Sequence, residues 1–317
     1  MDTLITAIIV VIGVPAVVCG YIIATEWVIR GFSSGAKARI RPWLWVLPAF
    51  LFLGVFLIYP TIRTFVNSLF GRGGDFIGFA NYADLLGSGD FWQVLLNNAL
   101  WIVFFTGAVV VLGLIIAVLT DRVRYETLAK AIIFIPMAIS FVAAGVIWNF
   151  MYNINEDIGT LNAAITAVGA DPVPFLQNPP WNTFFLIIVG IWMWVGFAMI
   201  ILSAGLKGIS TELLEAARMD GATELQVFFR IILPLLAPTI AVVGTTVVIT
   251  ALKTFDIIYI MTNGNFNTSV IGFEFYQEQF VNRDPGAAAA VAILLLVAIV
   301  PIMLINIRRF QAQEAIR

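Results

Sequence analysis

The chain contains no histidine and a single cysteine, Cys19, in 317 residues. The absence of histidine excludes a Ser-His-Asp triad, an HExxH helix and a histidine-based zinc site, and one cysteine cannot form an intrachain disulfide. We therefore expect no catalytic residue and no metal site. Cys19 lies in an apolar run and is expected to be a small buried side chain.

Charge is also scarce. Charged residues make up 11% of the chain and hydrophobic residues 61%, with a mean hydropathy of +0.99. Soluble domains have about 25% charged and about 45–50% apolar residues. So few charges cannot cover a water-exposed surface, so the sequence requires a lipid bilayer. The net charge of −2 provides no basic field for nucleic acid.

Seven stretches are apolar enough to cross a membrane, which takes about 20 mostly apolar residues. They lie at residues 4–28, 43–62, 95–119, 129–151, 183–206, 231–252 and 287–307. The first stretch lacks a basic segment before it and is too long for a signal peptide, so it is expected to be a helix of the protein. We predict an all-α fold, a polytopic transmembrane helical bundle of about seven spans.

The distribution of Lys and Arg predicts the orientation. Thirteen of the 17 lie in the segments after spans one, three, five and seven, and the other four lie on the opposite side. Because positive residues accumulate on the cytoplasmic side, the N-terminus is expected outside and the C-terminus in the cytoplasm. Three outer segments, near 63–94, 152–182 and 253–286, are expected to be short ordered loops. Aromatic residues near span ends are expected at the membrane interface: Trp43, Trp45, Tyr59, Trp92, Trp101, Tyr152 and Trp181.

Spans two to seven contain no Asp or Glu. Proton- and sodium-coupled carriers commonly place carboxylates at membrane depth, and ion channels need rings of charge or exposed carbonyls. The sequence shows neither pattern, so the energy for any transport is expected to come from another protein.

The loop between spans five and six is expected to form two short helices around a turn. Ser210 is placed to cap the first helix, and Gly221 can take the left-handed conformation that ends it. Thr223 and Gln226 have the spacing of a capping box for the second helix. The loop carries the pattern Glu215-Ala216-Ala217, three residues, Gly221, nine residues, and Ile231-x-Leu233-Pro234.

This pattern resembles the EAA signature of binding-protein-dependent ABC importer permeases, which share the MetI-like fold. The resemblance implies that 207–234 is a coupling loop that docks on a separate ATPase, with Glu215, Ala216, Ala217, Asp220 and Gly221 as its coupling residues. The chain has no GxxxxGK[ST] motif, so ATP and Mg are expected on the partner ATPase, with no cofactor on this chain and no enzyme activity of its own. The expected partners are a second permease, an ATPase dimer, an extracytoplasmic sugar-binding protein and membrane lipid, in a bacterial or archaeal cytoplasmic membrane.

The resemblance extends from about residue 43 to the C-terminus and is strongest to the carbohydrate-uptake branch, including α-glucoside permeases. Its patterns include Gly78-Phe79-Ala80-Asn81-Tyr82, Asn97-Asn98, Ile135-Pro136 and Thr262-Asn263-Gly264. The sequence departs from that branch at Gly264-Asn265-Phe266, where many relatives have Gly-Gly-Pro. The implied regions are an extra N-terminal helix and basic linker (1–42), a helix with the first outer loop (43–94), and the permease core (95–317).

The implied substrate is a sugar, such as an α-glucoside, maltose or trehalose. Sugars stack on aromatic faces and need amide or hydroxyl partners. Alignment on the EAA loop with the maltose-permease relative implies substrate contacts at Met193, Trp194, Phe197, Thr250 and Thr254. The neighbouring candidates for substrate binding are Asn149, Trp192, Lys253, Phe255 and Asp256. Lys253 and Asp256 are expected to pair on a helix face. The alternatives are a permease for another solute (polyol, amino acid, polyamine or phosphate) and a membrane scaffold without a pathway. A membrane enzyme is disfavoured because the sequence offers no convergent nucleophile and base.

Overall fold

The computed structural model describes residues 2–314, and the side chains of residues 6, 11–13 and 15–304. It divides the chain into two units, residues 1–66 and 67–317. The described residues form helices, with one isolated β-bridge between Phe70 and Phe76. The predicted all-α fold is confirmed.

The first unit is a helical hairpin. It contains α1 (Asp2–Ile29) followed by α2 (Ser34–Leu53), the π-helical η1 (Gly54–Ile58) and α3 (Tyr59–Asn67), which form one continuous helix. The hydroxyl of Tyr21 donates to the carbonyl of Leu44, and Arg41 pairs with Glu26 at 2.8 Å. Cys19 is exposed on α1, so its predicted burial is wrong. The hairpin buries few side chains, so its apolar surface is left for lipid or another polypeptide.

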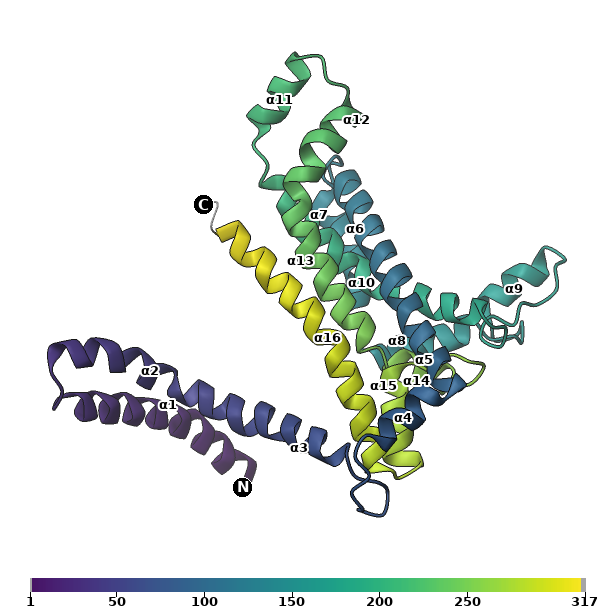
Figure 1. Cartoon of the computed structure of the whole chain (residues 1–317). Helices are drawn as coiled ribbons and strands as arrows, with labels where there is room; N and C mark the ends of the chain where they lie inside the picture. Colours follow the sequence, from purple (N-terminus) through teal and green to yellow (C-terminus); the bar gives the residue numbers. More distant parts are fainter. Residues whose placement is uncertain (1, 315–317) are drawn as a thin grey trace. The chain divides into compact units, whose positions relative to one another are not determined.

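The second unit contains the remaining helices (Figure 1). They are α4 (Ala80–Gly87), α5 (Gly89–Leu100), η2 (Trp101–Phe105), α6 (Thr106–Thr120), α7 (Glu126–Phe134), η3 (Ile135–Ala138), α8 (Phe141–Met151), α9 (Thr160–Ala167), α10 (Trp181–Lys207), α11 (Thr211–Met219), α12 (Glu224–Val227), η4 (Phe228–Ile232), α13 (Leu233–Leu252), α14 (Asp256–Met261), α15 (Ile271–Tyr276), η5 (Gln277–Val281) and α16 (Pro285–Glu314).

The long helices of this unit run side by side. α10 packs against α6 and α13, and α13 packs against α16. α11 and α12 lie at one end of this bundle, which we call the loop end, and α4, α14 and α15 lie at the opposite end (Figure 1). Six helices of the described chain are long and apolar enough to span a membrane, and the bent pair α7–α8 brings the number to seven if it forms one span. The predicted number of spans is therefore confirmed.

The predicted span 129–151 is not one straight helix. Its two halves, Glu126–Ala138 and Phe141–Met151, meet at an angle of 98°. Pro136 lacks a backbone N–H and lies in the 3₁₀ turn η3, where the first half ends. Ser140 then caps α8 by accepting a hydrogen bond from the amide of Ala143 at 3.2 Å. The chain thus changes direction sharply within a continuous apolar stretch.

Two of the seven aromatic residues predicted at the membrane interface are in the core instead. Trp101 is 1% exposed and Tyr152 is 4% exposed. Tyr152 packs among Trp148, Phe175 and Phe185, and burial raises the pKa of its hydroxyl. The other five, Trp43, Trp45, Tyr59, Trp92 and Trp181, are exposed, as an interfacial position requires.

Gly113 allows α6 to approach α10 closely. A Cβ atom at this position would lie 2.5 Å from the Cβ of Ala198. We expect Gly113→Val to lower the midpoint of thermal unfolding of the purified protein, because overpacking a tight helix contact costs about 1–3 kcal/mol. Gly107→Val is the matched control, since nothing lies within 4 Å of a Cβ there. Equal midpoints for the two variants would contradict this packing.

Candidate functional site

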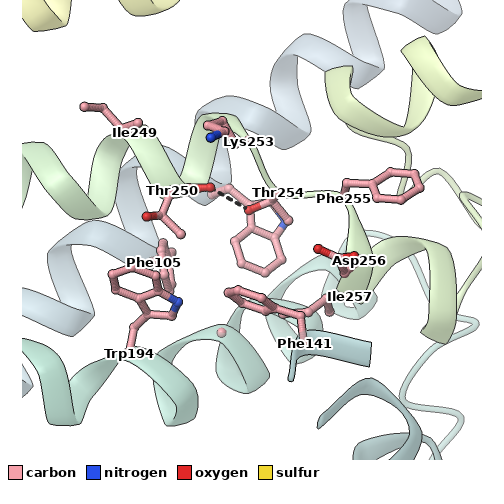
Figure 2. A pocket seen from close by; sticks show the side chains of 12 residues that line it. Phe105, Phe141, Trp194, Ile249, Thr250, Lys253, Thr254, Phe255, Asp256 and Ile257 are labelled. Carbon is pink, nitrogen blue, oxygen red and sulfur yellow. Dashed lines mark hydrogen bonds between the residues drawn. The ribbon is translucent and has the colours of Figure 1, made fainter. Parts of the chain in front are cut away.

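A cavity of about 310 Å³ lies between α10, the end of α13 and the start of α14 (Figure 2). We call it the central cavity. Its aromatic lining comes from Trp101, Phe105, Phe141, Trp194 and Phe255. Its polar lining comes from Thr250, Lys253, Thr254 and Asp256. Gly190, Ile249 and Ile257 complete the wall.

The polar wall depends on where α13 ends. The helix stops at Leu252, and Phe255 has a non-helical φ of −145° before α14 begins at Asp256. Thr254 hydrogen-bonds to the carbonyl of Thr250 at 3.3 Å. This break separates Lys253 from Asp256, and no ion pair joins them among the described residues. The prediction that they pair on one helix face is therefore wrong, and both charges line the cavity.

Six of the ten candidate substrate residues line the central cavity: Trp194, Thr250, Lys253, Thr254, Phe255 and Asp256. The other four do not. Met193 is 3% exposed in the core, Trp192 packs edge-on against Trp148, and Phe197 packs edge-on against Trp194. Asn149 donates to the carbonyl of Ile260 at 3.0 Å and lines a different cavity.

The sequence interpretation missed several lining residues from other parts of the chain. Trp101 and Phe105 belong to η2, and Phe141 is the first residue of α8. Gly190 makes room for the first two, because a Cβ there would lie 2.8 Å from the Trp101 ring. The buried indole N–H of Trp101 has no hydrogen-bond partner among the described residues.

The central cavity is chemically suited to a small polar molecule with apolar faces. Aromatic rings, hydroxyls, an ammonium group and a carboxylate converge on one space. The part of the chain that the structure describes holds no group of three or more His, Cys, Asp or Glu side chains placed for a metal ion. The arrangement fits binding by stacking and hydrogen bonding.

The loop between α10 and α13 forms the two short helices that the sequence predicts, α11 and α12. Gly221 has a φ of +83°, which is the left-handed conformation predicted for it. Thr223 and Gln226 form the predicted capping box, with both hydrogen bonds present. Ser210 is the N-cap residue of α11, as predicted, but its side chain makes no capping hydrogen bond.

The loop presents a mixed apolar and polar surface. Glu215, Ala216 and Asp220 are exposed, Ala217 is half-buried, and Met219 and Leu225 are 87% and 71% exposed. α11 and α12 project from the helical bundle (Figure 1). So many exposed apolar side chains at the tip of a loop indicate a surface that another protein covers.

One ion pair, between Glu224 and Arg122, joins this loop to the turn between α6 and α7. Glu224 accepts from Arg218 at 2.7 Å and lies 3.9 Å from Arg122 of the turn. The hydrogen bond from Arg218 to Glu224 raises the pKa of the arginine.

A second group of charges, which we call the Lys130 cluster, lies beside it. Lys130 donates to Asp121, Glu126 and Ser203, and Lys207 donates to Glu126. Ser203 also donates to Asp121 at 2.7 Å. The Lys130 side chain is only 14% exposed. The cluster ties the end of α6 and the start of α7 to the last turns of α10, directly before the loop.

These features define a multi-pass membrane protein with a solute-sized cavity and a docking loop. The sequence matches the family "Binding-protein-dependent transport system inner membrane component" over residues 109–309, and the chain belongs to that family. It is therefore a permease component of the inner membrane, as the EAA pattern predicts.

Individual relatives cover nearly the whole chain. The osmoprotective compounds uptake permease protein GgtC of Synechocystis is 49% identical, over 86% of this chain and 100% of the relative. The α-glucoside transport system permease protein AglF of Rhizobium meliloti is 42% identical over 97% of each chain. A bacterial alginate ABC transporter, solved in complex with an alginate pentasaccharide-bound periplasmic protein, has a TM-score of 0.71 at 27% identity, over 85% of this chain and 94% of that chain.

Proposed function

We propose that this chain is the permease subunit of an importer that moves a sugar through the central cavity, driven by ATP hydrolysis on a separate subunit. One observation carries the proposal. The two helices that wall the cavity, α10 and α13, are the same two helices that enter and leave the exposed loop. A partner that moves the loop therefore acts directly on the walls of the substrate site.

A sugar fits the chemistry of the central cavity. Aromatic faces suit the C–H faces of pyranose rings, and Thr250, Lys253 and Asp256 supply hydrogen-bond donors and acceptors for hydroxyls. The relatives named for α-glucosides and osmoprotective compounds support a glycoside or a related polyhydroxy solute. The absence of Asp and Glu from the predicted spans two to seven argues against ion-coupled transport of that solute.

The exposed loop is proposed to bind the ATPase. Glu215 supplies a polar anchor, Ala216 and Ala217 allow close approach, and Asp220 with Gly221 forms the turn between the two helices. ATP and Mg belong to the ATPase pair in this proposal. A second permease completes the pathway, because one subunit cannot enclose it, and a solute-binding protein delivers the sugar on the outside. The alginate transporter in complex with its periplasmic protein supports that last partner.

Transport then requires two discrete arrangements of the helices, each favoured by a different ligand. ATP binding moves the loop, closes the side of the membrane that the loop faces and opens the other side. The asymmetry of Lys and Arg supports a cytoplasmic position for the loop. Hydrolysis returns the helices to the first arrangement.

Thr250→Ala and Trp194→Ala test the central cavity. Each removes one lining group, and the loss of one hydrogen bond or one stacking contact is expected to raise the half-saturating concentration for some sugars by about five- to tenfold. The measurement is uptake of maltose, trehalose and sucrose by the reconstituted complete transporter. Thr245→Ala is the matched control. In the described part of the chain its hydroxyl donates only to the carbonyl of Ala241 on the same helix, and Thr245 does not line the cavity. An unchanged preference profile would argue against this cavity as the substrate site.

A further inference from the structure

A second cavity, of about 550 Å³, lies away from the loop end, between α8, the segment before α10, and the segment after α14. Four of its lining residues carry side-chain amides: Asn149, Asn153, Gln177 and Asn265. The others are apolar, aromatic or hydroxyl-bearing, and none of the lining residues carries a formal charge. We call it the amide cavity. This composition suits a neutral polyhydroxy ligand, since each amide both donates and accepts hydrogen bonds.

The amide groups keep unused hydrogen-bonding capacity. The side chains of Gln177 and Asn265 are exposed and make no hydrogen bond with any described residue. Asn149 uses its Nδ2 on the carbonyl of Ile260, and Asn153 uses its Oδ1 on the amide of Asn155. In the described part of the chain, the Oδ1 of Asn149 and the Nδ2 of Asn153 have no partner.

One wall of the amide cavity is a loop fixed in a strained conformation. Phe266 has a φ of +56° and its ring is 49% exposed. A left-handed conformation is unfavourable for such a residue and persists only where the surroundings enforce it. The buried amide of Asn182 donates to the Phe266 carbonyl at 2.8 Å, and Asn97 donates to the Asn267 carbonyl at 2.7 Å. These bonds hold an aromatic ring at the cavity, where it can stack on a sugar.

The two cavities share their helices. Phe141, at the start of α8, lines the central cavity, and Asn149, near the end of α8, lines the amide cavity. Asp256 and Met261 occupy the corresponding two ends of α14. α8 and α14 pack tightly, since a Cβ on Gly145 would lie 3.0 Å from Ile260. α14 has six residues, so it separates the two cavities by about 9 Å.

We propose that the amide cavity is a second carbohydrate site, which holds a neutral sugar on the outer side before it reaches the central cavity. This inference rests on the proposed function. A sugar delivered at the end opposite the loop meets the uncharged amides and the exposed ring of Phe266 first. It then meets the separate charges of Lys253 and Asp256 in the central cavity. Asn265 and Phe266 occupy the place where many permeases of this kind have Gly-Gly-Pro, so these two lining residues distinguish this chain from those permeases.

The first test is the double variant Gln177→Ala with Asn265→Ala in the complete transporter, reconstituted with its ATPase, second permease and binding protein. Neither side chain bonds to a described residue, so folding is expected to be unaffected. The half-saturating concentration of maltose or trehalose is expected to rise about tenfold with the maximal rate unchanged, because two hydrogen bonds to the sugar are lost. Asn178→Ala, beside Gln177 but not in the lining, is the matched control.

The second test measures sugar binding independently of transport. Ile154 lines the amide cavity and is 48% exposed, so Ile154→Cys in a Cys19→Ser background places a single thiol there. A membrane-impermeant maleimide added outside the cell is expected to label it, and saturating trehalose is expected to slow labelling several-fold relative to an osmotically matched salt. Labelling only from inside would overturn the outer position of the site.

The outcomes separate the two proposals. The amide cavity would be overturned as a sugar site if the Gln177→Ala and Asn265→Ala double variant kept its half-saturating concentration and trehalose did not protect Ile154→Cys from labelling. If Thr250→Ala still altered sugar preference, the proposed function would stand. If neither the amide-cavity variants nor Thr250→Ala changed half-saturation, protection or sugar preference, both the second carbohydrate site and the proposed function would be overturned.

Discussion

Replacing Gly221 by leucine is expected to reduce sugar uptake and sugar-stimulated ATP hydrolysis by at least about tenfold, while the binding protein still captures sugar normally. Gly221 has a φ of +83° at the turn between α11 and α12. This conformation destabilises a residue with a Cβ by about 1–2 kcal/mol, and it is less favourable still for a bulky side chain. Nothing lies within 4 Å of a Cβ at this position, so the effect comes from the backbone and not from a clash within the chain.

The strain is expected to move α11 relative to α12 and so to displace the surface that we propose binds the ATPase. Gly221→Asn is the matched control, because asparagine tolerates left-handed backbone better than other non-glycine residues, and it is expected to retain most of the activity. Glu215→Ala removes an exposed carboxylate of the same surface without changing the backbone, and it is expected to lower the same two rates. Full uptake by the leucine variant would refute the coupling role of the loop.

Local patterns of the sequence predicted the loop well. The left-handed glycine and the capping box depend on residues within a few positions of each other, and Gly221, Thr223 and Gln226 behave as their chemistry requires. The number of spans followed from length and apolarity alone. These predictions needed no knowledge of what packs against what. Ser210 lies at the N-cap position of α11 but makes no capping hydrogen bond, so a local pattern can predict the position of a cap without predicting its hydrogen bond.

Hydropathy failed where the backbone turns inside an apolar run. Residues 129–151 are mostly apolar, so an average of hydropathy over the stretch cannot detect the 98° bend at Ile139 and Ser140. The signals were Pro136 and a capping serine, which change the direction of the chain but hardly change its hydropathy. The same limit applies to Lys253 and Asp256, whose predicted pairing assumed that α13 continues beyond Leu252.

The residues that line the central cavity were predicted only in part. Helix periodicity places residues on faces, but only tertiary packing shows which face lines the cavity. Gly190 and Trp194 are four residues apart and both line the central cavity. Met193 is rotated about 100° from Trp194 and points into the core. Trp101 was assigned to the membrane interface because it lies near a span end, but contacts with α10, distant in sequence, bury it in the cavity wall.

Lys130→Met is expected to uncouple the transporter. The variant removes the ammonium group that holds Asp121, Glu126 and Ser203 together, and it leaves two largely buried carboxylates facing each other with Lys207 as their remaining cation. Breaking a charge cluster of this kind weakens the attachment of α7 to the end of α10. We expect uptake to fall about tenfold, within the usual range of coupling energies, while basal ATP hydrolysis continues.

The decisive quantity is the number of ATP molecules hydrolysed per sugar imported. It is expected to rise in Lys130→Met and to return toward normal in Lys130→Arg, which restores the charge. Arg124→Met removes a positive charge from the same turn, at an exposed residue with no ion pair in the described chain, and it is expected to leave the ratio unchanged. A loss of uptake with an unchanged ratio would mean that the Lys130 cluster supports folding only. A raised ratio would mean that α7, and through it Phe141 in the wall of the central cavity, moves with the loop when the ATPase acts.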